Sequence, residues 1–119
     1  MKRKIITIEN DIVCIPQSDD IWMTQHELAD LFGCFVSKLN SNIRSILKSG
    51  VLSEPDVCRI YNYQNGSFVE VYSLDMIIAL SFRIQSENAK IFREWLTRKL
   101  TKSEIPEMLI LSMRNPMLN

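Results

Sequence analysis

Histidine and cysteine, the side chains most often used in nucleophilic catalysis and zinc sites, are few in this sequence. His26 is the only histidine, and Cys14, Cys34 and Cys58 stand far apart with no paired spacing. That pattern is neither a disulfide framework nor a zinc site. We therefore expect buried, unreactive thiols, a solvated His26, and no metal or cofactor.

An enzymatic function is not indicated either. No Ser/His/Asp or Cys/His set can be assembled around His26, and no glycine-rich phosphate loop is present. Asp19-Asp20 is the only adjacent pair of carboxylates, and it follows Pro16 in a segment typical of a solvated turn. We expect no catalytic residues and a protein that is not an enzyme.

The segment from residue 37 to residue 48 has a different chemistry, because it combines cationic side chains with hydroxyls and amides. Lys38, Arg44 and Lys48 lie in a stretch with no acidic residue between Asp30 and Glu54. The whole chain has 14 basic and 14 acidic residues, so its net charge is zero. The local charge nevertheless has the sign that a phosphate backbone requires.

Two short helices are predicted to position this segment. Thr24 followed by Glu27 has the spacing of a capping box, which indicates that a helix opens there. Ala29, Gly33 and Leu39 stand at the four- and six-residue steps of a helix-turn-helix, in which a small residue allows close packing and glycine makes the turn.

The second helix should run from Val36 to Ser49 and end at Gly50. Its apolar face consists of Leu39, Ile43, Ile46 and Leu47. Its opposite face consists of Ser37, Asn40, Ser41, Arg44 and Lys48. By helical phase Phe35 and Val36 point towards the core; alternatively, they form an apolar surface for a protein partner.

The remaining segments predict a small sheet and two packing helices. Strand patterns occupy residues 5–8 and 12–15 around a tight turn, residues 21–23, and residues 59–63 and 67–72 around Asn65-Gly66. We expect the N-terminal strands to join the small sheet, and residues 51–58, which contain Pro55, to form a loop. Helices should run from Ser73 or Asp75 to about Gln85, and from Ser86 to about Lys102. The expected fold is α+β: a winged helix-turn-helix-like domain with a small antiparallel sheet or hairpins and two C-terminal packing helices.

Several motifs resemble the N-terminal domain of the RhuM virulence-protein family. The resemblance covers about residues 5–101 and is carried first by residues 21–25 (IWMTQ) and 28–33 (LADLFG). It continues through Ser37, Ile43, Asp56-Val57-Cys58, Tyr72, Leu74-Asp75, Ile77-Ile78, Arg83, Phe92-Arg93 and Trp95. The second half is similar, more distantly, to phage antirepressor domains of the Bro-N type, through Leu74, Ser86, Ala89, Phe92 and Trp95. The resemblance implies a bacterial or phage-derived protein, associated with mobile or virulence-related DNA, that binds DNA.

We therefore expect a DNA-binding protein with a transcription-regulatory or mobile-element-associated role, with double-stranded DNA as its partner and a homodimer as its assembly. Ser37, Asn40 and Ser41 would reach base edges, while Lys38, Arg44 and Lys48 would neutralise phosphates. Thr24 and Gln25 would bind a phosphate through backbone donors at a helix N-terminus. Asn65 would lie in the wing.

Residues 1–104 should form the RhuM-like helix-turn-helix domain, and residues 105–119 an apolar tail. That tail, helical over residues 108–113, is either a dimer contact or the start of a further region. The alternative function is a protein–protein interaction module that uses Phe35, Val36 and this tail. No apolar stretch is long enough to span a bilayer or to act as a secretory signal, so we expect no membrane association and a cytoplasmic protein.

Overall fold

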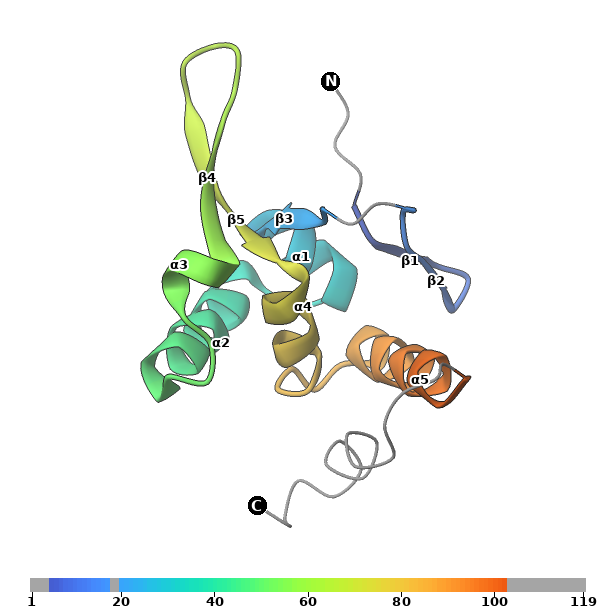
Figure 1. Cartoon of the computed structure of the whole chain (residues 1–119). Coiled ribbons are helices and arrows are strands. Elements are labelled where there is room, and N and C mark those ends of the chain that lie inside the picture. Colours follow the sequence, from blue (N-terminus) through green and yellow to red (C-terminus); the bar gives the residue numbers. More distant parts are fainter. Residues whose placement is uncertain (1–4, 18–19, 103–119) are drawn as a thin grey trace.

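The computed structural model describes residues 5–17 and 20–102, which fold into helices and small antiparallel sheets (Figure 1). The expected α+β class is confirmed. In chain order the elements are β1 (Thr7–Glu9), β2 (Ile12–Cys14), β3 (Trp22–Thr24), α1 (Gln25–Phe32), α2 (Val36–Ser49), α3 (Glu54–Val57), β4 (Cys58–Asn62), β5 (Phe68–Ser73), α4 (Leu74–Ser81) and α5 (Glu87–Lys102). Asp19 and the predicted tail at residues 105–119 lie outside the described residues.

The larger sheet has the strand order β3–β5–β4, with both pairs antiparallel. Trp22 pairs with Ser73 and Thr24 with Val71, so the strand before α1 is joined to the second strand of the β4–β5 hairpin. This pairing joins the start of α1 to the base of the hairpin, which extends away from the helices in Figure 1.

The N-terminal strands do not join that sheet, so this prediction was wrong. Among the described residues β1 and β2 pair only with each other, through a turn in which Asn10 and Asp11 both have positive φ (51° and 62°). Ile6, which precedes β1, is buried, and β2 packs against α5. Burial of its apolar side chains on the helical core, rather than extension of the ladder, determines its position.

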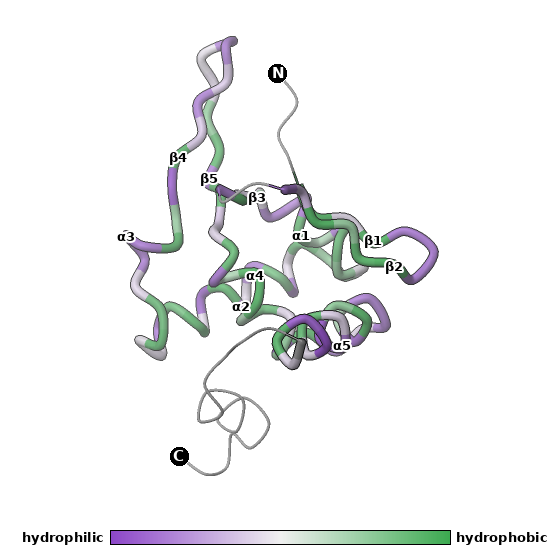
Figure 2. Tube along the Cα trace, turned by 45° about the vertical axis from the view of Figure 1, so that its right-hand side comes forward, coloured by the Kyte–Doolittle hydropathy of each residue, from purple (hydrophilic) through white to green (hydrophobic). Residues whose placement is uncertain are grey.

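The core lies where α1, α2, α4 and α5 meet under the three-stranded sheet. Figure 2 shows hydrophobic segments gathered at this junction, whereas the β1–β2 turn is strongly hydrophilic. Phe32 and Phe92 pack edge to face at its centre, with ring centroids 5.8 Å apart. Leu39, Ile43 and Ile46 attach α2 to this core, so the predicted apolar face of the second helix is correct for these residues, while Leu47 is half-buried beside them.

Two predictions of local structure need correction. Residues 54–57 form the one-turn helix α3 instead of a loop, because proline is tolerated in the first turn of a helix, where its missing N–H has no partner to lose. The helix expected to reach Gln85 ends at Ser81. Arg93 of α5 donates to the Ser81 and Ile84 carbonyls, which stabilises the chain reversal that follows.

Within the described part of the chain, no helix combines the length and the apolar character needed to cross a bilayer.

Candidate nucleic-acid interface

The start of α1 is fixed by the predicted capping box. The Glu27 N–H donates to Thr24 Oγ1 (3.1 Å), and the Thr24 N–H donates to Glu27 Oε1 (2.9 Å). Thr24 is also buried. The backbone N–H and the side-chain oxygen of Thr24 are therefore both paired within the capping box. Gln25, the first helical residue, is half-buried, and its side chain bonds to other residues of the chain.

The turn between α1 and α2 depends on Gly33. Its backbone is left-handed (φ 63°, ψ 45°), and its N–H closes the helix by donating to the Ala29 carbonyl. A Cβ at this position would lie 3.7 Å from Asn88 Nδ2, so space is not limiting and the positive φ alone requires glycine. Ala29 and Leu39 are buried on either side of the turn, as the helix-turn-helix spacing predicts.

α2 covers the predicted residues without a shift and ends at Gly50, which is left-handed. Opposite its buried residues it exposes a polar and cationic surface, which we call the α2 outer face. This face consists of Ser37, Lys38, Ser41, Arg44 and Lys48. No acidic residue occurs between Asp30 and Glu54, and neither the β4–β5 hairpin nor any other described segment covers the face.

Asn40 differs from the other predicted base-contacting residues. It is half-buried, and its Nδ2 donates to Gln25 Oε1 at 3.1 Å. The two residues were both predicted to bind DNA, but their contact with each other was not. Nothing in their 15-residue separation suggests it, because the contact depends on how α1 packs across α2.

Of the two interpretations of Phe35, packing towards the core is wrong, because 83% of its surface is exposed. Phe35 is the N-cap of α2 and its backbone is extended (φ −73°, ψ 147°), so helical phase does not apply to its side chain. It borders a shallow hollow of about 520 Å³ together with Ala29, Asp30, Gly33, Cys34 and Lys38. Val36, the first helical residue, is half-buried.

Asn65 lies at the tip of the β4–β5 hairpin, where its side chain closes the turn. Its Oδ1 accepts from the Ser67 N–H (2.9 Å) and from Ser67 Oγ (2.6 Å), and Gly66 follows it with φ 90°. The hairpin carries no charged residue between Arg59 and Glu70, and it exposes Ile60 and Phe68.

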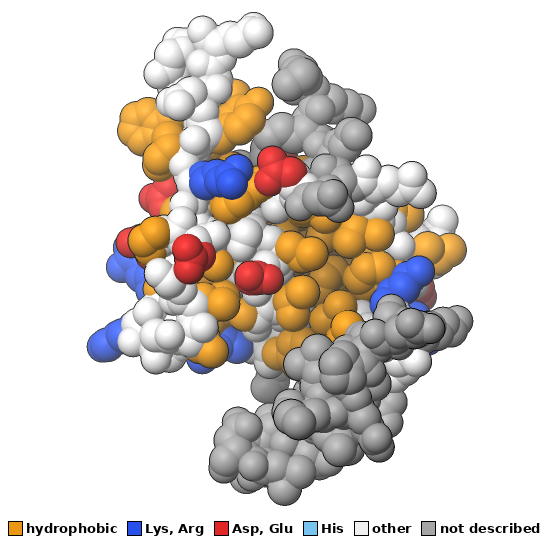
Figure 3. All heavy atoms as spheres, viewed as in Figure 1, with side chains coloured by type: hydrophobic (Ala, Val, Ile, Leu, Met, Phe, Trp, Pro, Cys, Tyr) orange, Lys and Arg blue, Asp and Glu red, His pale blue; other side chains and the backbone are white. Residues whose placement is uncertain are grey.

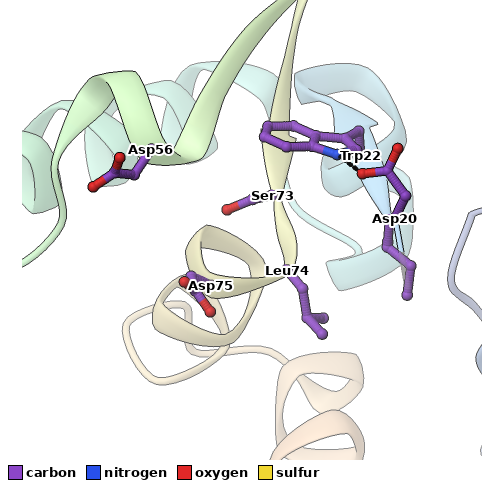
Figure 4. Close-up of a pocket in the computed structure, with 7 residues that line it drawn as sticks. Asp20, Trp22, Asp56, Ser73, Leu74 and Asp75 are labelled. Atoms are coloured by element: carbon purple, nitrogen blue, oxygen red, sulfur yellow. Dashed lines mark hydrogen bonds between the residues drawn. The ribbon is translucent and has the colours of Figure 1, made fainter. Parts of the chain in front are cut away.

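A second polar region lies on another part of the surface. Asp20, Ile21, Trp22, Asp56, Ser73, Leu74 and Asp75 line an open pocket of about 410 Å³, which we call the acidic pocket (Figure 4). Arg59 stacks on the Trp22 ring, 4.0 Å from its centroid, and lies 3.7 Å from Asp20. Ser73 Oγ is buried without a hydrogen-bond partner in the structure. In Figure 3 carboxylates lie near the centre of this view, whereas several Lys and Arg side chains lie along its left edge, on the side of α2.

The three cysteines differ in their exposure to solvent. Cys14 is exposed, which corrects the expectation of a buried thiol, while Cys34 and Cys58 are half-buried. Burial raises the pKa of Cys34; burial and the adjacent Glu70 raise the pKa of Cys58 to about 12. Neither is an activated thiolate. Among the residues that the structure describes, no three His, Cys, Asp or Glu side chains are grouped to hold a metal ion.

Comparison of this chain with protein-family models, with curated proteins and with solved structures finds no match.

Proposed function

We propose that this chain is a non-enzymatic protein that binds double-stranded DNA through the α2 outer face. The observation that carries the proposal is an exposed helical surface with three cations and two hydroxyls, in a segment without any carboxylate from residue 31 to residue 53. Such a surface combines charge neutralisation of phosphates with side chains able to bond base edges.

The order of elements supports a winged helix-turn-helix architecture within this proposal. α1 and α2 would be the helix pair, with α2 as the recognition helix in the major groove, and the β4–β5 hairpin would be the wing. Pairing of β3 with β5 supports this assignment, because it fixes the base of the hairpin beside the start of α1.

In this arrangement Ser37 and Ser41 contact bases, and Lys38, Arg44 and Lys48 contact phosphates. The N–H of Gln25, at the start of α1, and Asn65, at the hairpin tip, would lie at the edges of the contact. A homodimer would place two such helices on paired half-sites. A transcription-regulatory or mobile-element-associated role, and the relation to the RhuM family, belong to the same proposal and rest on the sequence resemblance.

Binding to a random-sequence duplex at different salt concentrations tests this function. Each phosphate contact contributes about −0.9 to the slope of log affinity against log salt concentration. With three such contacts, raising the salt concentration from about 50 to about 200 mM should weaken binding about fortyfold. Fluorescence anisotropy of a labelled duplex measures this directly. The absence of salt-dependent binding would contradict the proposal.

The exposure of Phe35 supports a second candidate function, a protein–protein interaction module on the same scaffold. A large exposed aromatic side chain at the start of α2 would supply an apolar contact, together with Val36 and residues 108–113, which lie outside the described residues. This candidate predicts concentration-dependent self-association or partner binding that Phe35→Ser weakens. It also predicts little or no salt-dependent binding to duplex DNA.

A further inference from the structure

A line of hydrogen-bonded side chains runs from β5 through α1 to α2. Tyr72 Oη donates to Glu70 Oε2 (3.3 Å), Gln25 Nε2 donates to Tyr72 Oη (3.2 Å), and Asn40 Nδ2 donates to Gln25 Oε1 (3.1 Å). The line therefore connects a carboxylate on the hairpin with an amide on the helix that we propose to enter the major groove.

The carboxylate at one end of this line determines which side chain is the donor in each hydrogen bond. A carboxylate can only accept hydrogen bonds, so Tyr72 must donate its one proton to Glu70. The Tyr72 oxygen then accepts from Gln25, whose amide nitrogen must face it. The Gln25 carbonyl consequently faces α2 and can be bonded only by a donor, which is the Asn40 amide nitrogen.

Burial of Tyr72 and a second donor to Glu70 favour this donor-to-acceptor direction. Tyr72 is only 3% exposed, and burial raises the pKa of its hydroxyl, so the group keeps the proton that it donates. Cys58 Sγ also donates to Glu70 Oε2 (3.2 Å), and the pKa of this thiol is raised to about 12. Glu70 thus receives two donors that stay protonated at neutral pH. Tyr72 is shielded from water whereas Glu70 is exposed, so the hydrogen bonds of the Tyr72 hydroxyl are the part of the line that is hardest to rearrange.

With its nitrogen held by Gln25, Asn40 has one N–H and its carbonyl oxygen left for a ligand. One donor beside one acceptor is the pattern that pairs with N7 and the N6 amino group of adenine in the major groove. A reversed amide, bonded to Gln25 through its oxygen, would leave its two N–H donors to meet the N7 and O6 acceptors of guanine instead.

We infer that Glu70, acting through Tyr72 and Gln25, orients the Asn40 amide so that the protein prefers adenine over guanine at one position of its DNA site. This inference rests on the proposed DNA-binding function and deepens it by naming the base that is read. Glu70 is a positioning residue in this scheme and does not itself contact the base.

The test compares the wild-type protein with Glu70→Gln. A glutamine at position 70 can accept from Tyr72 or donate to it, so the line can run in either direction and the Asn40 amide loses its fixed orientation. Glu94→Gln is the matched control, because it also removes one carboxylate but lies on α5, exposed and without any of these contacts. Tyr72→Phe is a second variant, which interrupts the line while keeping the aromatic ring.

Duplexes selected from a random pool by the wild-type protein give the sequence preference, and Asn40→Ala identifies the position that depends on Asn40. At that position, replacing adenine with guanine should weaken wild-type binding about tenfold, within the range of one bidentate contact. Glu70→Gln and Tyr72→Phe should reduce this ratio to less than about threefold, while Glu94→Gln leaves it unchanged. The salt slope on random duplex, which reports phosphate contacts, should be the same for the wild type and for all four variants.

The possible outcomes separate this inference from the proposed function. Wild-type adenine preference retained in both Glu70→Gln and Tyr72→Phe would overturn the inference and leave DNA binding intact. Asn40→Ala with no loss of preference at any position would do the same. Failure of the wild-type protein to bind duplex at all would overturn both. Thermal melts of each variant identify any loss of folding, which would lower all affinities without changing the ratio between bases.

Discussion

The α2 outer face and the acidic pocket are opposite in charge although both belong to a chain with no net charge. The first exposes Lys38, Arg44 and Lys48 without a nearby acid along the chain. The second gathers Asp20, Asp56 and Asp75, with Arg59 at its rim. Because the two sets of charges are sorted onto different surfaces, the net charge gives no indication of which partner either surface would accept.

The two regions also differ in how they are built. The α2 outer face comes from one continuous helix, in which residues three or four apart share a side. The acidic pocket is assembled from residues 20–22, 56 and 73–75, which the β3–β5 pairing and α3 bring together. A surface of the first kind can be recognised from periodicity, whereas one of the second kind requires the tertiary structure.

Reversing the charge of the α2 outer face should give the largest effect. In Lys38→Glu/Arg44→Glu/Lys48→Glu, three favourable phosphate contacts become repulsive, and we expect duplex affinity to fall on the order of a hundredfold or more. Anisotropy titrations at one fixed salt concentration measure the change. A loss of less than about threefold would place the DNA contact elsewhere.

Two controls sharpen this comparison. Asp56→Asn/Asp75→Asn neutralises the acidic pocket, and if the pocket lies outside the DNA contact, affinity should change by no more than about twofold. Lys90→Glu/Arg98→Glu/Lys99→Glu on α5 changes the total charge by the same amount as the α2 variant. An equal loss of affinity in the α5 variant would mean that overall charge, and not the α2 outer face, drives binding.

Disturbing the turn before α2 should have the next largest effect. Gly33→Ala places a Cβ on a residue with φ 63°, so we expect the free energy of unfolding to fall by about 1 kcal/mol. Urea denaturation followed by circular dichroism measures the loss.

Gly66→Ala is the matched control for that variant, since Gly66 also has a positive φ (90°) but lies at the hairpin tip. The free energy of unfolding of Gly66→Ala should fall by a similar amount, but the attachment of α2 should not be weakened. An unchanged stability in Gly33→Ala would show that the turn can adopt another backbone conformation.

Removal of a single cation should give a smaller and diagnostic change. Arg44→Ala should weaken binding to all duplexes to a similar degree and reduce the slope of log affinity against log salt by about one. Binding measured at four or more salt concentrations gives this slope. A slope equal to that of the wild type would remove Arg44 from the phosphate contacts.

The last effect concerns pH and the thiol at the base of the hairpin. The pKa of Cys58 is raised to about 12 in the folded state, so the folded chain keeps a proton that the unfolded chain loses above about pH 9. Stability from this group is fully present below pH 9 and should decrease as pH rises from about 9 towards about 12. Tyr72 should add a change of the same sign, because its pKa is also raised.

Urea denaturation at pH 7.5, 9 and 10 follows this loss. Cys58→Ala should show a weaker decline than the wild type over the same interval, because one of the two titrating groups is gone. An identical decline in both proteins would mean that Cys58 does not contribute.

Much of the fold could be predicted because its signals are local. The Thr24–Glu27 capping box, Gly33, Gly50 and the Asn65-Gly66 turn each fix a boundary through the backbone conformation or hydrogen bonds of a few neighbouring residues. The periodic burial of Leu39, Ile43 and Ile46 likewise follows from helix geometry alone. These features place α1, α2 and the hairpin within one residue of the predicted bounds at nearly every end.

The errors had two causes, contacts between distant segments and the local backbone conformation at a helix end. The β1–β2 hairpin packs against α5 rather than joining the sheet, and Phe35 is exposed because an N-cap has extended backbone. Glu70 and Tyr72 were not identified as site residues, since only the packing of β5 against α1 brings them to Gln25.

The amino-acid sequence by itself determined that α2 would form, where it would end and that one side of it would be cationic, because each of these depends on spacing along a single helix. Only the tertiary structure decided which amide on that helix would be held in one orientation and which carboxylates would share a pocket. Those arrangements depend on hydrogen bonds and charges between side chains that are distant in sequence, and a linear pattern carries no information about such distances.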